Sequence, residues 1–273
     1  MVDGCCIQVL TDVVLGYDKL TSLLQQSVFE VHVPNLPSVD RSRPPTADLK
    51  SDTAHVRSVA GDLMNIGHTL TVLMHSYGGQ IGTNALSSIS LSQRTQSSLP
   101  GGISHLIYMG AHINPSGRST IDNVRHFNHE HLMPLAFDFA LDMTVLSRDP
   151  KMLFIGETNL PDAEVDEYLS TLQVWIGQGM HQPITAAVAA WREIPVTYIH
   201  TTEDMTVPYE YQKYFVGGVE KEGVSVQTCV VESGHCANFT AAEDVADVVG
   251  KCLVLRGREM VKGRGERILR MLY

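Results

Sequence analysis

The sequence predicts an α/β protein with a mostly parallel sheet of about six strands, flanked by helices and carrying one helical insertion. Three observations support this. Short apolar runs alternate with amphipathic segments along the chain, and repeated strand–helix units favour a parallel sheet covered on both faces. The 273 residues are 44% hydrophobic, which suits one domain with a sizeable core. Between 113 and 190, helical patterns continue without a convincing strand. We therefore assign 1–112 and 191–273 to the core, and 113–190 to a helical lid.

The first quarter of the chain contains two expected strands and two expected helices. CCIQVL (5–10) is typical of a short strand, and YDKLTSLLQQ (17–26) places its leucines on one side of a helix. VFEVHVPNL (28–36) alternates apolar and polar residues until Pro34 ends the strand pattern. From 52 to 66, apolar residues recur at helical spacing and predict an amphipathic helix.

The remaining core segments continue the alternation. A helix is expected after the strand at 68–75, in YGGQIGTNALSSI, and another after the capping-box sequence TAAE (240–243). The other apolar strands are expected at 103–111, 195–202 and 224–231.

The net charge and the cysteine content indicate which binding partners and which cellular compartment to expect. The formal net charge of −10 argues against nucleic acid or an anionic membrane as the main partner. No run of about 18 apolar residues and no signal-peptide pattern occurs. Five cysteines match neither a zinc site nor a disulfide framework, so we expect reduced thiols and a cytoplasmic protein. The tail 251–273 has a net charge of +5, and we expect it to be solvated.

The stretch TVLMHSYGGQIG (71–82) raises the first catalytic hypothesis. An apolar strand that runs into a serine and two glycines is typical of a nucleophile elbow, in which a strained turn lifts the serine above the sheet. Ser76 would be the nucleophile, and the amide of Tyr77 would face the oxyanion. The pattern G-x-S-x-G is incomplete, because Met74 occupies the first glycine position. The alternative is a buried strand that ends in a glycine-rich turn, with Ser76 as a cap.

A serine nucleophile needs a base and an orienting carboxylate, which follow late strands in this type of fold. Asp204 follows the strand at 195–202, and His235 follows the strand at 224–231. Parallel strands bring both to the same sheet edge as Ser76. Each has a simpler explanation. Asp204 is also a typical turn residue, and Glu203 beside it is an alternative candidate for the carboxylate. His235 is also a typical loop residue. Their order and placement together favour a Ser-Asp-His triad.

Three segments, VLMHSYGG, PVTYIHTTEDMTVP and ESGHCANF, resemble the α/β-hydrolase superfamily. More narrowly, they resemble compact esterase-like hydrolases of fungi and bacteria whose elbows read apolar-His-Ser-Tyr-Gly-Gly. The similarity extends over about 17 to 253. It implies the α/β-hydrolase fold, with Ser76 as nucleophile, Asp204 as acid, His235 as base, and no cofactor.

One departure from the family concerns the second oxyanion donor. The family usually ends its first strand in a proline-glycine or histidine-glycine loop, whereas this chain has Gln8, Val9, Leu10 and Thr11 there. Either the amide of Leu10 or of Thr11 serves, or the oxyanion hole is impaired. Loss of one oxyanion donor slows turnover by roughly 10² to 10³.

Weaker signals concern the pocket. His112, Trp175 and Met180 are candidates for substrate contacts under the lid, although core packing explains the last two equally well. RHFNHEH (125–131) clusters histidines but lacks the spacing of a helical zinc site, so we expect a polar lid segment and no metal.

The leading functional hypothesis is a serine hydrolase acting on a small-molecule carboxylic ester or lactone. One alternative uses the same triad for C–C bond cleavage or ring closure in a biosynthetic pathway. Another is a degenerate hydrolase that binds a ligand without turnover. The substrate and the oligomeric state are not specified by the sequence.

Overall fold

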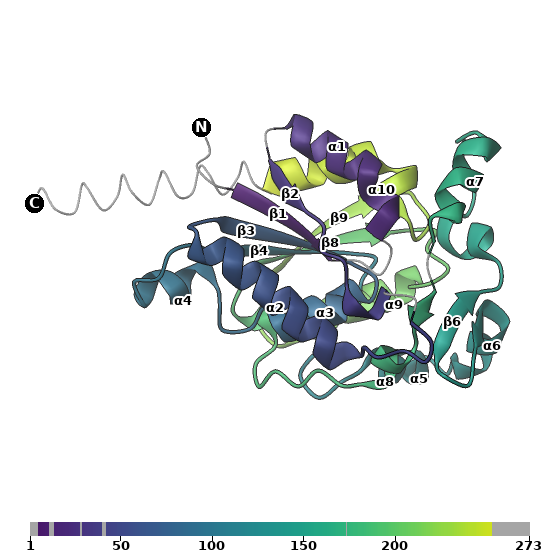
Figure 1. Cartoon of the computed structure of the whole chain (residues 1–273), viewed down its shortest axis with the longest axis horizontal. Coiled ribbons are helices and arrows are strands. Elements are labelled where there is room, and N and C mark those ends of the chain that lie inside the picture. Colours follow the sequence, from purple (N-terminus) through teal and green to yellow (C-terminus); the bar gives the residue numbers. More distant parts are fainter. Residues whose placement is uncertain (1–4, 11–13, 28, 40–41, 173, 253–273) are drawn as a thin grey trace, which may run out of the picture.

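In the computed structural model, a parallel sheet forms the centre of the protein (Figure 1). The structure describes residues 5–10, 14–27, 29–39, 42–172 and 174–252. Within these residues the sheet has six strands in the order β2-β1-β3-β4-β8-β9, and every neighbouring pair is parallel. The strands are β1 (Cys5–Leu10), β2 (Glu30–His32), β3 (Thr69–His75), β4 (Gly102–Met109), β8 (Val196–Thr201) and β9 (Val226–Val231).

Helices cover both faces of this sheet (Figure 1). One face carries α2 (Leu49–Asn65), α3 (Gly78–Ala85) and α9 (Tyr209–Lys221). The other carries α1 (Asp18–Gln26), α10 (Ala237–Thr240) and the helical residues 242–252. The short α4 (Leu91–Gln96) precedes β4, and single turns of 3-10 helix occur at η1 (Val14–Tyr17), η2 (Pro37–Val39) and η5 (Ala190–Arg192).

Side-chain alternation along the strands builds a separate core on each face. In β3, Leu70, Val72 and Met74 pack in the core beneath α2 and α3, whereas Leu73 packs in the core beneath α1. Successive side chains of a strand point to opposite faces, so a strand buried on both sides is apolar throughout. This confirms the expected mostly parallel sheet of about six strands, flanked by helices.

The expectation that 113–190 contains no strand is wrong. This segment, which we call the insertion, contains a three-stranded antiparallel sheet in the order β5-β6-β7. Its strands, of two to four residues, are too short for a periodic pattern, and aromatic packing of Phe137, Phe139 and Trp175 supports them. The strands are β5 (Phe137–Phe139), β6 (Thr144–Ser147) and β7 (Trp175–Ile176).

Helical segments surround this small sheet, as the sequence predicts. The α-helices are α5 (Thr120–His126), α6 (Met133–Ala136), α7 (Asp162–Ser170) and α8 (Gln178–His181), with a 3-10 turn η3 (Glu130–Leu132) and a π-helical turn η4 (Lys151–Ile155). The insertion lies between β4 and β8, which are neighbours in the sheet, and Figure 1 shows β6, α6 and α7 beside the core.

Other differences from the sequence expectations are small. The expected strand 28–36 is reduced to β2, and the α4 helix is additional. Thr11 and most of the basic tail 251–273 lie outside the described residues. No helix in the described part of the chain has the length and apolar character needed to cross a membrane.

Candidate active site

Ser76 stands on a sharp turn between β3 and α3. Its backbone has a φ of +54°, a left-handed conformation that is strained for a residue with a side chain. The turn is held because the Ser76 carbonyl accepts hydrogen bonds from the amides of Gly79, at 3.1 Å, and His112, at 3.2 Å. A Cβ at Gly79 would lie 2.5 Å from the His112 carbonyl oxygen, so only glycine allows α3 to approach this closely. The geometry is that of a strand–turn–helix elbow with serine at its apex.

Asp204 follows β8 in a tight turn, where four hydrogen bonds fix its carboxylate. Oδ1 accepts from the amides of Thr206, at 2.8 Å, and Val207, at 2.7 Å. Oδ2 accepts from the hydroxyl of Thr201, at 2.9 Å, and lies 2.8 Å from Nδ1 of His235. These contacts hold both carboxylate oxygens in place, with Oδ2 against the imidazole of His235.

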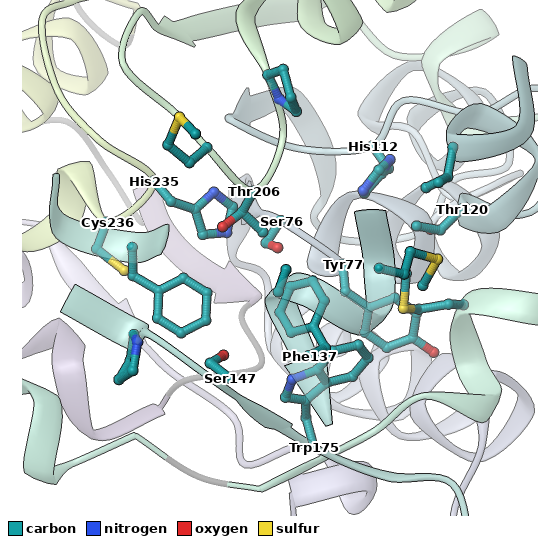
Figure 2. A pocket seen from close by; sticks show the side chains of 18 of the residues that line it. Ser76, Tyr77, His112, Thr120, Phe137, Ser147, Trp175, Thr206, His235 and Cys236 are labelled. Carbon is teal, nitrogen blue, oxygen red and sulfur yellow. The ribbon is translucent and has the colours of Figure 1, made fainter. Parts of the chain in front are cut away.

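His235 follows β9 and completes the arrangement. Its side chain is 4% exposed and contacts Asp204 through Nδ1. Since an ionised carboxylate can only accept, Nδ1 is the donor in this hydrogen bond. Ser76 and His235 line one pocket, and Figure 2 shows the serine hydroxyl and the imidazole ring close together at its wall. The structure thus brings together the three residues that the sequence proposed as a triad.

Two further histidines surround His235 and are held neutral. His75 packs its ring 4.5 Å from that of His235, and its Nε2 donates to the His235 carbonyl at 2.9 Å. Burial, and secondarily the charge of His235, lower the pKa of His75 well below its ordinary value. The same causes lower the pKa of His112 to about 3. His235 is therefore surrounded by uncharged imidazoles, and His75 also fixes the backbone that carries it.

A chain of polar groups sets the position of the Asp204 turn. The fully buried Gln212 on α9 donates through Nε2 to the Thr201 hydroxyl and carbonyl, both at 2.9 Å, and to the Val207 carbonyl at 2.8 Å. Because Gln212 supplies a hydrogen to the Thr201 hydroxyl, the hydrogen of that hydroxyl is left for Asp204 Oδ2. The order of donors along this chain orients the carboxylate toward the imidazole.

The pocket in front of Ser76 has a cavity volume of about 260 Å³ and lies between the core and the insertion. His112, Trp175 and Met180 all line it, as the sequence suggested for substrate contacts. Tyr77 lines it as well, and Figure 2 shows Trp175 and Phe137 across the pocket from His235. The structure thus places all three candidates on the pocket wall.

Gln80 of α3 joins the elbow to the insertion. Its side chain is fully buried, and its Nε2 donates to the carbonyls of Gly179 and Gln182, both at 2.9 Å. Its Oε1 accepts from Asn114 and from the hydroxyl of Thr120. The helix that follows Ser76 and the insertion are therefore joined by hydrogen bonds.

The proposed oxyanion donors lie at the elbow and at the end of the neighbouring strand. Tyr77 directly follows Ser76 and precedes the first residue of α3. Leu10 is the last residue of β1 and pairs with Met74, two positions before the serine. Thr11, the other candidate donor, lies outside the described residues.

The histidines of the segment 125–131 contact different partners. His126 stacks on Tyr214 with ring centroids 4.2 Å apart, whereas Nδ1 of His131 hydrogen-bonds to the Asn128 carbonyl. Within the described residues, no group of three or more His, Cys, Asp or Glu side chains is arranged to hold a metal ion.

Sequence reasoning missed His75, Thr201 and Gln212. His75 directly precedes Ser76 in VLMHSYGG, and Thr201 ends the strand before Asp204, so their positions gave a local signal. Gln212 gave none, because only the folding of α9 onto β8 brings its amide to the Asp204 turn.

The chain belongs to the alpha/beta hydrolase family, whose model matches residues 13–248. It is similar to the probable hydrolase R7 of Phoma sp., with 25% identity over 224 residues that cover 79% of this chain and 83% of that protein. Among solved structures, the methylesterase MES16 from Arabidopsis has a TM-score of 0.70 at 17% identity, covering 92% of this chain and 99% of MES16. A pyrethroid hydrolase from Sphingobium faniae JZ-2 has a TM-score of 0.66 at 18% identity, with 91% and 96% coverage. The two structures share the fold of this chain.

Proposed function

We propose that the protein is a serine hydrolase that cleaves a carboxylic ester or lactone of a small organic molecule through an acyl-enzyme on Ser76. The observation that carries the proposal is the 2.8 Å contact between His235 Nδ1 and Asp204 Oδ2, at the wall of the pocket that Ser76 also lines. Similarity to a hydrolase of Phoma sp. supports it, as does the shared fold of a methylesterase and a pyrethroid hydrolase.

In the proposed reaction, Nε2 of His235 takes the proton of Ser76 as Oγ attacks the carbonyl carbon of the substrate. Asp204 stabilises the imidazolium that forms. The amide of Tyr77, at the start of α3, and the amide of Leu10 are the proposed donors to the tetrahedral oxyanion.

Collapse of the tetrahedral species breaks the bond between the acyl carbon and the alcohol oxygen, and the proton on His235 passes to that oxygen. In a lactone, the released hydroxyl stays attached to the acyl chain. Water, activated by His235, then attacks the acyl-enzyme and releases the acid. No cofactor takes part in this sequence of steps.

The test is a turnover screen with p-nitrophenyl esters from acetate to decanoate and with simple lactones. Wild-type protein is expected to hydrolyse some of these substrates, and Ser76→Ala and His235→Ala are each expected to lose at least about 10³ in kcat. Equal turnover by Ser76→Ala would contradict the proposal. Covalent labelling of Ser76 without turnover of any ester or lactone would instead favour C–C bond cleavage or cyclisation by the same three residues.

A further inference from the structure

The described residues that line the pocket around Ser76 and His235 are mostly apolar. Most of its wall comes from the insertion, including Phe137, Leu172, Trp175 and Met180. Among the described residues that line it, none is Lys, Arg, Asp or Glu. A charged group that entered would lose its hydration without meeting an opposite charge, which strongly disfavours binding.

His129 of the insertion and Tyr211 of α9 form a polar pair in this pocket. Nδ1 of His129 lies 2.9 Å from the Tyr211 hydroxyl, and both residues line the cavity. Tyr211 is 4% exposed, and burial raises its pKa to about 12, so its hydroxyl keeps its hydrogen.

The hydrogen bond between the Tyr211 hydroxyl and His129 Nδ1 bears on the tautomer of His129, since its geometry is compatible with donation from either group. If Tyr211 donates to Nδ1, the neutral imidazole carries its own hydrogen on Nε2. That Nε2–H has no hydrogen-bond partner in the described part of the protein, and it belongs to a half-buried residue on the pocket wall.

The neighbouring histidines of the same segment are placed differently. His126 and His131 are exposed, and neither lines the pocket. His129 is therefore the member of the histidine-rich segment 125–131 that contacts the cavity.

We propose that the pocket selects an uncharged, apolar ester or lactone that carries a second oxygen acceptor, which His129 binds through Nε2–H. The inference rests on the proposed hydrolysis at Ser76 and specifies the substrate class for that site. Tyr211 acts through His129 as a positioning residue, because it fixes which ring nitrogen donates. A substrate with a free carboxylate is rejected by the apolar wall.

The first experiment changes only the charge of the substrate. Mono-p-nitrophenyl glutarate carries a carboxylate at pH 8, and its methyl ester has the same chain without the charge. Wild-type kcat/KM is expected to be at least about 100-fold higher for the methyl ester, since an unpaired carboxylate would be buried. Equal kcat/KM for the two compounds would overturn the charge selection.

The second arm tests His129. A series of methyl p-nitrophenyl diesters from succinate to suberate places a second carbonyl at increasing distance from the scissile ester. Each diester is compared with the p-nitrophenyl alkanoate of equal chain length. At one or more lengths the diester is expected to have a KM about 3- to 10-fold lower, the contribution of one neutral hydrogen bond.

Three variants of the protein test whether His129 binds the second carbonyl of the substrate or only supports the fold. In His129→Leu and Tyr211→Phe the preference for the diester is expected to disappear, whereas His129→Gln retains an amide donor and restores part of it. His131→Leu, an exposed change in the same segment, is the matched control and should keep the preference. No diester preference at any length, or its persistence in His129→Leu, would overturn the role of His129.

The proposed function and this inference fail in distinguishable ways. If no ester is turned over and a fluorophosphonate does not react with Ser76, the hydrolase proposal fails. If alkanoates are hydrolysed normally but neither arm gives the expected result, only the substrate class is wrong.

Discussion

Replacement of Thr201 by valine tests whether the polar chain behind Asp204 positions the triad. The change keeps the shape of the side chain and removes the hydroxyl that donates to Asp204 Oδ2 at 2.9 Å. Gln212 retains the carbonyls of Thr201 and Val207 as acceptors, and Asp204 keeps its two amide donors and His235. The change therefore removes one hydrogen bond to a buried carboxylate and one of the three contacts of Gln212 Nε2, whose two carbonyl acceptors remain.

The expected size of the effect follows from that bond. A hydrogen bond to a charged group contributes about 1.5–3 kcal/mol, and a factor of ten in rate corresponds to about 1.4 kcal/mol. If the loss appears fully in the transition state, kcat/KM of Thr201→Val falls by about 10- to 100-fold. Thr201→Ser keeps the hydroxyl and should retain most of the activity.

The assay is hydrolysis of a p-nitrophenyl ester that the wild type accepts, with thermal unfolding of each variant to verify that the fold persists. Wild-type activity in Thr201→Val would refute the positioning role. So would an equal loss in Thr201→Ser and Thr201→Val, because the hydroxyl would then be irrelevant.

Two other predictions concern Gly110 and the buried histidines. Gly110 has a φ of +47°, and a Cβ there would lie 2.9 Å from Asp204 Oδ2. Gly110→Ala should therefore displace the carboxylate and lower kcat at least about 10-fold. An unchanged kcat in a folded variant would contradict this. Burial lowers the pKa of His112 to about 3 in the folded protein, whereas the pKa in the unfolded chain is about 6.5. The unfolded chain therefore binds more protons, and the folded state loses stability as the pH falls below about 6.5. At about 1.4 kcal/mol per pH unit, His112 alone should account for about 2 kcal/mol of destabilisation between pH 7 and pH 5. Urea unfolding of wild type and His112→Gln at both pH values measures this, and an equal pH dependence in the two proteins would exclude it.

The sequence predicted those features of the fold and the candidate site that depend on the order of segments along the chain. Ser76, Asp204 and His235, which follow the ends of three apolar strands, could be recognised because parallel strands bring their carboxyl ends to one edge, whatever the distance along the chain. The six-stranded sheet of the described residues followed from the same alternation of strands and helices.

The insertion was harder to predict because its strands, of two to four residues, span at most two repeats of the alternating strand pattern. Trp175 and Ile176 form a two-residue strand that exists only because β6 lies beside it. Gln212 and His129 also acquire their roles through contacts between distant segments, with Thr201 and Tyr211 respectively. No spacing in the sequence encodes such contacts.

The central claim is that Ser76 is an activated nucleophile, and reaction with a fluorophosphonate tests it most directly. Peptide mass spectrometry after labelling is predicted to find one phosphonylated residue, Ser76, with the label absent in Ser76→Ala and strongly slowed in His235→Ala. Ser147 also lines the pocket and serves as an internal comparison. A label on Ser147, or no label on folded wild-type protein, would contradict the account.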